Sequence, residues 1–207
     1  MYKVIEGNTS YELTEKKSKF IADLMYVENK QEAEDRIKEI KKKYHDARHN
    51  CYAYRVLENN SIYEKSSDDG EPSGTAGAPM LNLLQRNNLI NCVVVITRYF
   101  GGILLGTGGL VRAYSDSTAK TIEKANKAEI ELGIEYELHV DYPSFQNLQY
   151  YVQKNGISII STKYQEEITC NIVIKNDIKE KFLNDVQNKQ IDVKEMREIQ
   201  EIYVKII

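Results

Sequence analysis

The sequence predicts an α+β protein with two domains. The first is a sheet with helices on one face, and the second is a ferredoxin-like βαββαβ sandwich. Three observations predict this. The 207 residues, 42% apolar and 29% charged, have the composition of an ordinary globular protein. Eight of the 11 glycines fall in two segments, "SDDGEPSGTAGAPM" and "TRYFGGILLGTGG", where the backbone must bend or be closely approached. From residue 133 onward, short strand and helix patterns alternate. We therefore expect domains at residues 1–130 and 133–207.

The first domain begins with a strand, a helix and a hairpin. Residues 20–27 have strand character. Residues 28–46 place an apolar stripe at steps of four, three and four on a charged helix, formed by Ala33, Ile37, Ile40 and Tyr44. Residues 50–57 and 61–65 read as strands, with a turn at Asn59 and Asn60 between them.

The glycine-rich segments alternate with the remaining elements of this domain. Pro79 opens a short helix over residues 79–88, since proline is tolerated in the first turn. "CVVVITRYF", residues 92–100, is a continuous apolar run typical of a buried strand. Residues 110–129 predict a helix with one buried face, formed by Leu110, Ala113, Tyr114, Ser117, Thr121 and Ala125.

The second domain follows the order βαββαβ. Its strands are expected at residues 133–142, 157–164, 166–175 and 197–207, and its helices at residues 143–155 and 177–189.

Cysteine content and charge narrow the classes of function. Cys51, Cys92 and Cys170 are odd in number and lack CxxC spacing, which favours buried thiols in a reducing cytoplasm and argues against zinc. No window approaches the length of a membrane span and no basic, apolar leader is present, so we expect a cytoplasmic protein without a membrane partner. The net charge of −3 creates no global attraction to nucleic acid, so such binding must be local.

The second glycine-rich segment joins a buried strand to a helix, where free backbone N–H groups and the positive end of the helix dipole suit an anion. The candidate phosphate or nucleic-acid ligands are Arg98, Gly101, Gly102, Gly106, Thr107, Gly108, Gly109 and Arg112. A Walker A loop is excluded because Thr107 stands where lysine is required, and GxGxxG is excluded by Val111. The match to phosphate binding is therefore generic.

The two arginines have two interpretations. In the first, Arg98 and Arg112 flank one anion site and bind phosphate. In the second, they pair with acidic residues of the first segment and hold the two loops together. The candidate loop partners or ligand contacts there are Asp68, Asp69, Glu71, Ser73 and Thr75. An enzymatic alternative uses Asp68 or Asp69 as a magnesium ligand or base in phosphotransfer or hydrolysis.

Two further patterns also have alternatives. His49 and Cys51 lie on one face of a strand, as a Cys/His nucleophile pair would, although a buried structural thiol is favoured. Tyr99 and Phe100 have two interpretations: they stack on a nucleic-acid base, or they close the core beneath the loop. The second is favoured. The residues predict no catalytic constellation and no cofactor.

Four stretches carry a resemblance to a known family: "KKSKFIA" at residues 16–22, "HNCYAY" at 49–54, "SDDGEPSGTAG" at 67–77, and "VVVITRYFGGILLGTGGLVRAY" at 93–114. With them the chain resembles the bacterial two-domain form of the YigZ/IMPACT family over nearly its whole length. The resemblance implies a first domain similar to the second domain of a small-subunit ribosomal protein, and a second domain similar to a ferredoxin-like module of elongation factor G. Ala78 and Leu104 stand where relatives often have a basic residue.

Members of this family are regarded as modulators of translation or nucleic-acid binders without established enzymatic activity. The resemblance and the anion-suited loop together predict a non-enzymatic cytosolic factor that binds RNA or the ribosome. The alternatives are a phosphate-binding phosphotransfer or hydrolytic enzyme, and a protein adaptor that uses the acidic first loop and the C-terminal sheet edge.

Overall fold

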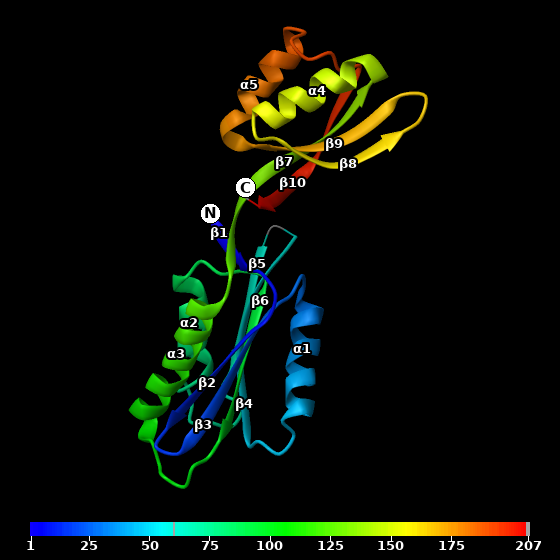
Figure 1. Cartoon of the computed structure of the whole chain (residues 1–207). Helices are drawn as coiled ribbons and strands as arrows, with labels where there is room; N and C mark the ends of the chain where they lie inside the picture. Colours follow the sequence, from blue (N-terminus) through cyan, green and yellow to red (C-terminus); the bar gives the residue numbers. More distant parts are fainter. Residues whose placement is uncertain (60, 206–207) are drawn as a thin grey trace. The chain divides into compact units, whose positions relative to one another are not determined.

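The computed structural model describes residues 1–59 and 61–205 (Figure 1). Part of the predicted turn, Asn60, and the end of the predicted last strand, residues 206–207, lie outside the described residues. The chain divides into two compact units, Tyr2–Glu129 and Met1 with Ile130–Ile207. Within the described residues, no helix is long and apolar enough to cross a membrane.

The first unit is built on an antiparallel sheet. Its strand order is β2 (Thr9–Glu15), β3 (Ser18–Tyr26), β6 (Cys92–Tyr99), β4 (His49–Glu58), β5 (Ser61–Ser67). In this register Arg98 on the central strand lies opposite Phe20 on one neighbour and His49 on the other. The loops that follow β5 and β6 therefore leave the sheet at the end where β3 and β4 begin.

Helices cover both faces of this sheet, so the prediction of helices on one face is wrong. Figure 1 shows α1 (Lys30–Lys43) on one side, and α2 (Gly77–Arg86) and α3 (Gly106–Lys124) on the other. The physical reason lies in β6, whose alternate side chains enter two separate cores. Val93 and Val95 pack with α1, whereas Val94 and Ile96 pack on the opposite side, and all are fully buried.

The predicted helices form, with shifted ends. In α1 the predicted residues Ala33, Ile37 and Ile40 are buried, and Asn29 caps the helix by accepting a hydrogen bond from the N–H of Glu32. The predicted face of α3 is buried along its whole length. However, α3 begins four residues earlier than predicted and ends at Lys124, because the glycines of the second segment join its first turn.

Two strands near the N-terminus were not predicted, β1 (Tyr2–Ile5) and β2. The reason is visible in β2, an edge strand whose residues alternate between half-buried and exposed and are mostly polar. Such a strand lacks the apolar run that marks β6.

The second unit has the predicted βαββαβ order. Its elements are β7 (Lys127–Val140), α4 (Tyr142–Lys154), β8 (Ser158–Tyr164), β9 (Ile168–Lys175), α5 (Asn176–Gln187) and β10 (Glu195–Lys205). The strands lie in the order β10-β7-β9-β8, all antiparallel. The core of this unit includes Leu138, Leu148, Ile172 and Phe182. The likeness to particular ribosomal and elongation-factor domains stays a prediction.

Candidate functional site

The first glycine-rich segment folds as a loop that the Asp68 carboxylate ties to the start of α2. Its Oδ1 accepts hydrogen bonds from the N–H groups of Ala76 (2.9 Å) and Gly77 (2.8 Å), and its Oδ2 accepts one from Gly74 (2.8 Å). Burial opposes the charged form, but these three donors outweigh it and lower the pKa of Asp68. Both oxygens are engaged within the protein, which disfavours a role as metal ligand or base.

Asp69 is engaged in the same way. Its Oδ1 accepts a hydrogen bond from Lys41 Nζ at 2.6 Å, and its Oδ2 accepts one from the Asn50 N–H at 2.8 Å. Its carbonyl oxygen lies 3.0 Å from His49 Nδ1. Across residues 1–59 and 61–205, no group of three or more His, Cys, Asp or Glu side chains is placed to hold a metal ion.

Glu71 reaches into the molecule and pairs with Arg98. Arg98 Nη1 lies 2.7 Å from Glu71 Oε1, and the two side chains are only 7% and 3% exposed. The Tyr114 hydroxyl donates to the same oxygen at 2.8 Å. Burial, followed by the nearby Cys51 and Glu71, raises the pKa of Tyr114 and keeps its hydroxyl protonated. Arg98 thus pairs with an acidic residue of the first loop, which is one of the two interpretations drawn from the sequence.

Cys51 belongs to the same buried network. Its Sγ donates to the carbonyl oxygen of Asp68 at 2.9 Å and lies 3.3 Å from the Tyr114 hydroxyl. Burial raises the pKa of the Cys51 thiol to about 12. A thiol held neutral in this way is a poor nucleophile, which favours the structural interpretation of the His49 and Cys51 pattern.

The remaining polar residues of the first loop form hydrogen bonds with the backbone of that loop or are exposed to solvent. Thr75 Oγ1 donates to the carbonyl of Pro72 at 2.6 Å, and Ser73 is exposed. Because the acidic side chains of this loop already have internal partners, they offer little to the adaptor alternative.

The second glycine-rich segment begins with a close approach between two backbones. A Cβ at Gly101 would lie 2.0 Å from the carbonyl carbon of Lys17, so no other residue fits without moving the chain. The Gly101 N–H donates to Ser18 Oγ at 3.2 Å. The loop after β6 is therefore packed directly against the turn between β2 and β3.

That turn consists of two lysines in the left-handed region. Lys16 and Lys17 have φ of 44° and 64°, whereas two-residue hairpin turns with both φ positive favour Asn-Gly. Both lysines are exposed, and neither has an ion pair or side-chain hydrogen bond among the described residues. These lysines were not predicted as site residues because β2, which forms the hairpin with β3, lacks the apolar run of a recognisable strand.

The start of α3 lies exposed beyond this turn. Gly106, Thr107 and Gly108 are exposed, no side chain caps the helix, and no acidic residue lies in its first turn. Gly102 and Gly106 have φ of 84° and 71°, which glycine adopts without strain. The uncapped N–H groups and the helix dipole at this position suit an anion, and binding of an anion here stays a prediction.

Arg112 does not join Arg98. It is exposed on α3 and lines a pocket of about 180 Å³ with Lys16, Glu15, Asp116, Gly109 and three apolar residues. Arg98 is buried with Glu71. The structure therefore brings Arg112 together with the β2–β3 turn, and brings the two glycine-rich segments together through Arg98.

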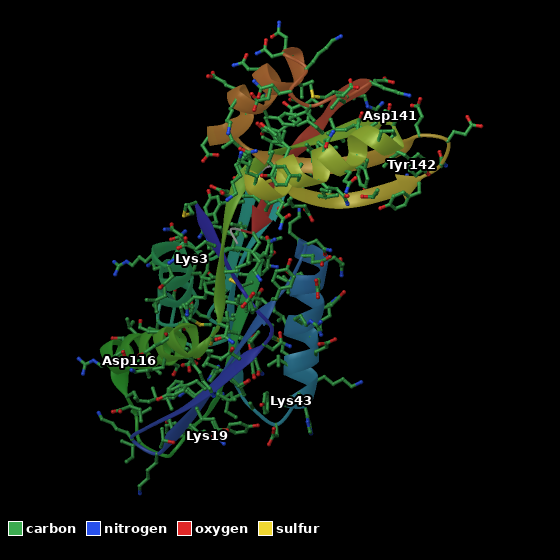
Figure 2. The ribbon with its side chains drawn as sticks, turned by 45° about the horizontal axis from the view of Figure 1, so that its top comes forward. Lys3, Lys19, Lys43, Asp116, Asp141 and Tyr142 are labelled. Atoms are coloured by element: carbon green, nitrogen blue, oxygen red, sulfur yellow. The ribbon has the colours of Figure 1, made fainter. Side chains whose placement is uncertain are left out.

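Further cations lie at this end of the first unit. Figure 2 shows Lys19, just after the turn, and Lys43, at the end of α1, both at the end to which the β2–β3 hairpin points. Lys19 differs from its neighbours because its Nζ pairs with Glu12 at 2.9 Å.

Comparisons with known proteins agree with this two-unit arrangement. Residues 16–122 match the family described as "Impact N-terminal domain", and residues 138–189 match "Domain of unknown function (DUF1949)". The IMPACT family member YvyE of Bacillus subtilis is 34% identical over 94% of this chain and 90% of its own. The IMPACT family member YigZ of Escherichia coli is 32% identical over 77% and 78%. A crystal structure of a hypothetical protein superposes with a TM-score of 0.64 at 27% identity, covering 96% and 97% of the two chains. In this chain the Impact N-terminal domain is followed by the second matched domain. The chain therefore belongs to the IMPACT family.

Proposed function

We propose that this protein is a non-enzymatic factor that modulates translation by binding RNA or the ribosome. The contact surface, named here the cationic end, comprises Lys16, Lys17, Arg112 and the start of α3 at Gly106–Gly109. Membership of the IMPACT family supports the translational role.

One observation favours this function above the others: Lys16 and Arg112, exposed and without internal partners among the described residues, line one pocket with Gly109 at an uncapped helix N-terminus, alongside Glu15 and Asp116. Lys17 is the next residue of the same turn, and its backbone lies against Gly101. Phosphate groups are the ligands that both features attract, since the side chains supply charge and the backbone supplies N–H donors. The net charge of the whole chain is −3, so attraction to RNA has to come from a local surface.

The environment of the acidic loop supports a non-enzymatic protein. The carboxylate oxygens of Asp68 and Asp69 accept hydrogen bonds from backbone N–H groups and from Lys41. Glu71 is paired with Arg98. No carboxylate of this loop is left poised to deprotonate a substrate.

Removing the three cations tests the proposal. We expect the Lys16→Gln, Lys17→Gln, Arg112→Gln variant to bind RNA more weakly. The negative slope of log K against log salt should become less steep by about 2, because each lost phosphate contact removes roughly 0.7 of its magnitude for a single strand. The measurement is filter binding of RNA, together with ribosome co-sedimentation, across a salt series.

A charge-matched control separates a local effect from one of net charge. Arg86, Lys154 and Lys163 are also exposed and have no ion pair among the described residues. The Arg86→Gln, Lys154→Gln, Lys163→Gln variant should bind as the parent does. Equal losses in both variants, or no salt-sensitive retention of the parent protein, would reject the proposal.

A further inference from the structure

We infer that the cationic end selects unpaired nucleotides, with the Phe100 ring as a platform on which a base stacks. This inference rests on the proposed RNA binding and names the form of RNA that the surface takes.

Apolar side chains stand exposed on the loop that follows β6. Phe100 is 56% exposed, Ile103 43% and Leu104 82%. Exposed apolar side chains grouped on one loop commonly mark an interaction site. The backbone of Gly101, the residue after Phe100, lies against that of Lys17, so Phe100 adjoins the turn that carries the two lysines.

The ring of Phe100 is supported from within the protein. The Arg98 guanidinium carbon lies 5.8 Å from the centroid of the Phe100 ring and 5.5 Å from that of Phe20. The guanidinium is itself fixed by Glu71. Arg98 thus contributes to the surface by positioning an aromatic ring and pairs with an acidic loop residue, which was one of its two interpretations from the sequence.

The backbone on either side of Phe100 is also fixed. The hydroxyl of Tyr99 donates to Asp46 Oδ1 at 2.7 Å, and Gly101 donates to Ser18 Oγ at 3.2 Å. Gly101 moreover lies against the Lys17 backbone. An exposed ring held in place before binding loses little conformational entropy when a ligand covers it.

Unpaired nucleotides complement this combination. Their phosphates reach Lys16, Lys17 and Arg112, while a base face covers the ring, as aromatic platforms do in proteins that bind single strands. In a duplex the base faces are stacked on one another, so it would satisfy the cations but leave Phe100 and Leu104 against sugar and phosphate.

The test compares a labelled short oligouridine with a duplex of equal length by fluorescence anisotropy. We expect the full-length protein to prefer the single strand. Phe100→Ala should weaken single-strand binding about 5- to 150-fold with an unchanged salt slope, because a stacking contact is lost and no phosphate contact. Phe100→Tyr should retain binding, and Phe100→Leu should lose it. Tyr150→Ala, which removes a 68% exposed ring from the second unit, should have no effect.

Other outcomes overturn the inference. Equal binding of strand and duplex by the parent protein would end it without any variant, while leaving the electrostatic proposal intact. Absence of binding to both at low salt would end both. Vesicles containing phosphatidylglycerol serve as a further arm. Sedimentation with them that depends on Phe100, together with oligouridine binding that does not, would assign the apolar loop to a lipid surface.

Discussion

The Asp68 carboxylate shows how one residue organises a loop that looks flexible in sequence. It accepts hydrogen bonds from three backbone N–H groups and so substitutes for the missing cap of α2. Its lowered pKa is the consequence of these bonds. A group whose pKa is lowered by folding stabilises the folded state above its unfolded pKa of about 3.9, and this contribution disappears as pH falls through the folded pKa.

Asp68→Asn is therefore expected to destabilise the protein by roughly 1 kcal/mol at neutral pH, because an amide offers one acceptor oxygen where the carboxylate offers two. The difference in free energy of unfolding between parent and variant should shrink as pH falls below about 4. Urea unfolding at several pH values measures this. Asp116→Asn, at an exposed position with no side-chain hydrogen bond among the described residues, is the control. A gap that stays constant with pH would refute the charge-based explanation.

At the scale of elements, the glycines of the second segment differ in whether the fold requires a residue without a side chain at their positions. A Cβ at Gly101 meets the Lys17 backbone, whereas a Cβ at Gly108 meets nothing within 4 Å. Gly108 lies inside α3 and its φ is not positive. The fold requires the first glycine and does not require the second.

The pair Gly101→Ala and Gly108→Ala separates the two roles. We expect Gly101→Ala to destabilise the protein by about 2 kcal/mol or more, since two backbones must move apart. Gly108→Ala should stabilise it by about 0.5 kcal/mol, since alanine is the better helix former. If a phosphate approaches this helix start, Gly108→Ala should nevertheless weaken RNA binding. Thermal unfolding and filter binding measure the two effects, and an unchanged affinity would remove Gly108 from the contact surface.

Elements with strong periodicity could be predicted from sequence, and those defined by their partners could not. The apolar stripe of α1 and the apolar run of β6 were each sufficient to predict the element that contains them. That run also held a missed signal, because a strand with four consecutive buried valine and isoleucine residues needs cover on both faces. The meeting of the glycine-rich segments was predictable, but the burial of Arg98 with Glu71 and the place of Arg112 beside β2 depend on three-dimensional register.

On the scale of the whole molecule, the two units have separate hydrophobic cores. Leu84 of α2 lies fully buried in the core of the first unit, and Leu148 of α4 lies fully buried in the core of the second. Units with their own cores commonly unfold as separate cooperative steps.

Leu84→Ala and Leu148→Ala form a matched test of that independence. Each should destabilise its own unit by about 2–5 kcal/mol, the cost of a cavity left by leucine, and should leave protection of the other unit nearly unchanged. Hydrogen exchange followed by mass spectrometry in urea resolves the two units. A uniform loss of protection along the chain in either variant would show a single cooperative unit.

The paired lysines at the β2–β3 tip set a limit on engineering this chain. Left-handed backbone costs about 1 kcal/mol or more at a residue with a side chain. A thermostability campaign would thus replace Lys16 and Lys17 with Asn-Gly among its first choices. The most stable variant obtained in that way would have lost two of the three positive side chains that we propose to contact RNA, so selection for thermal stability should be combined with a binding assay.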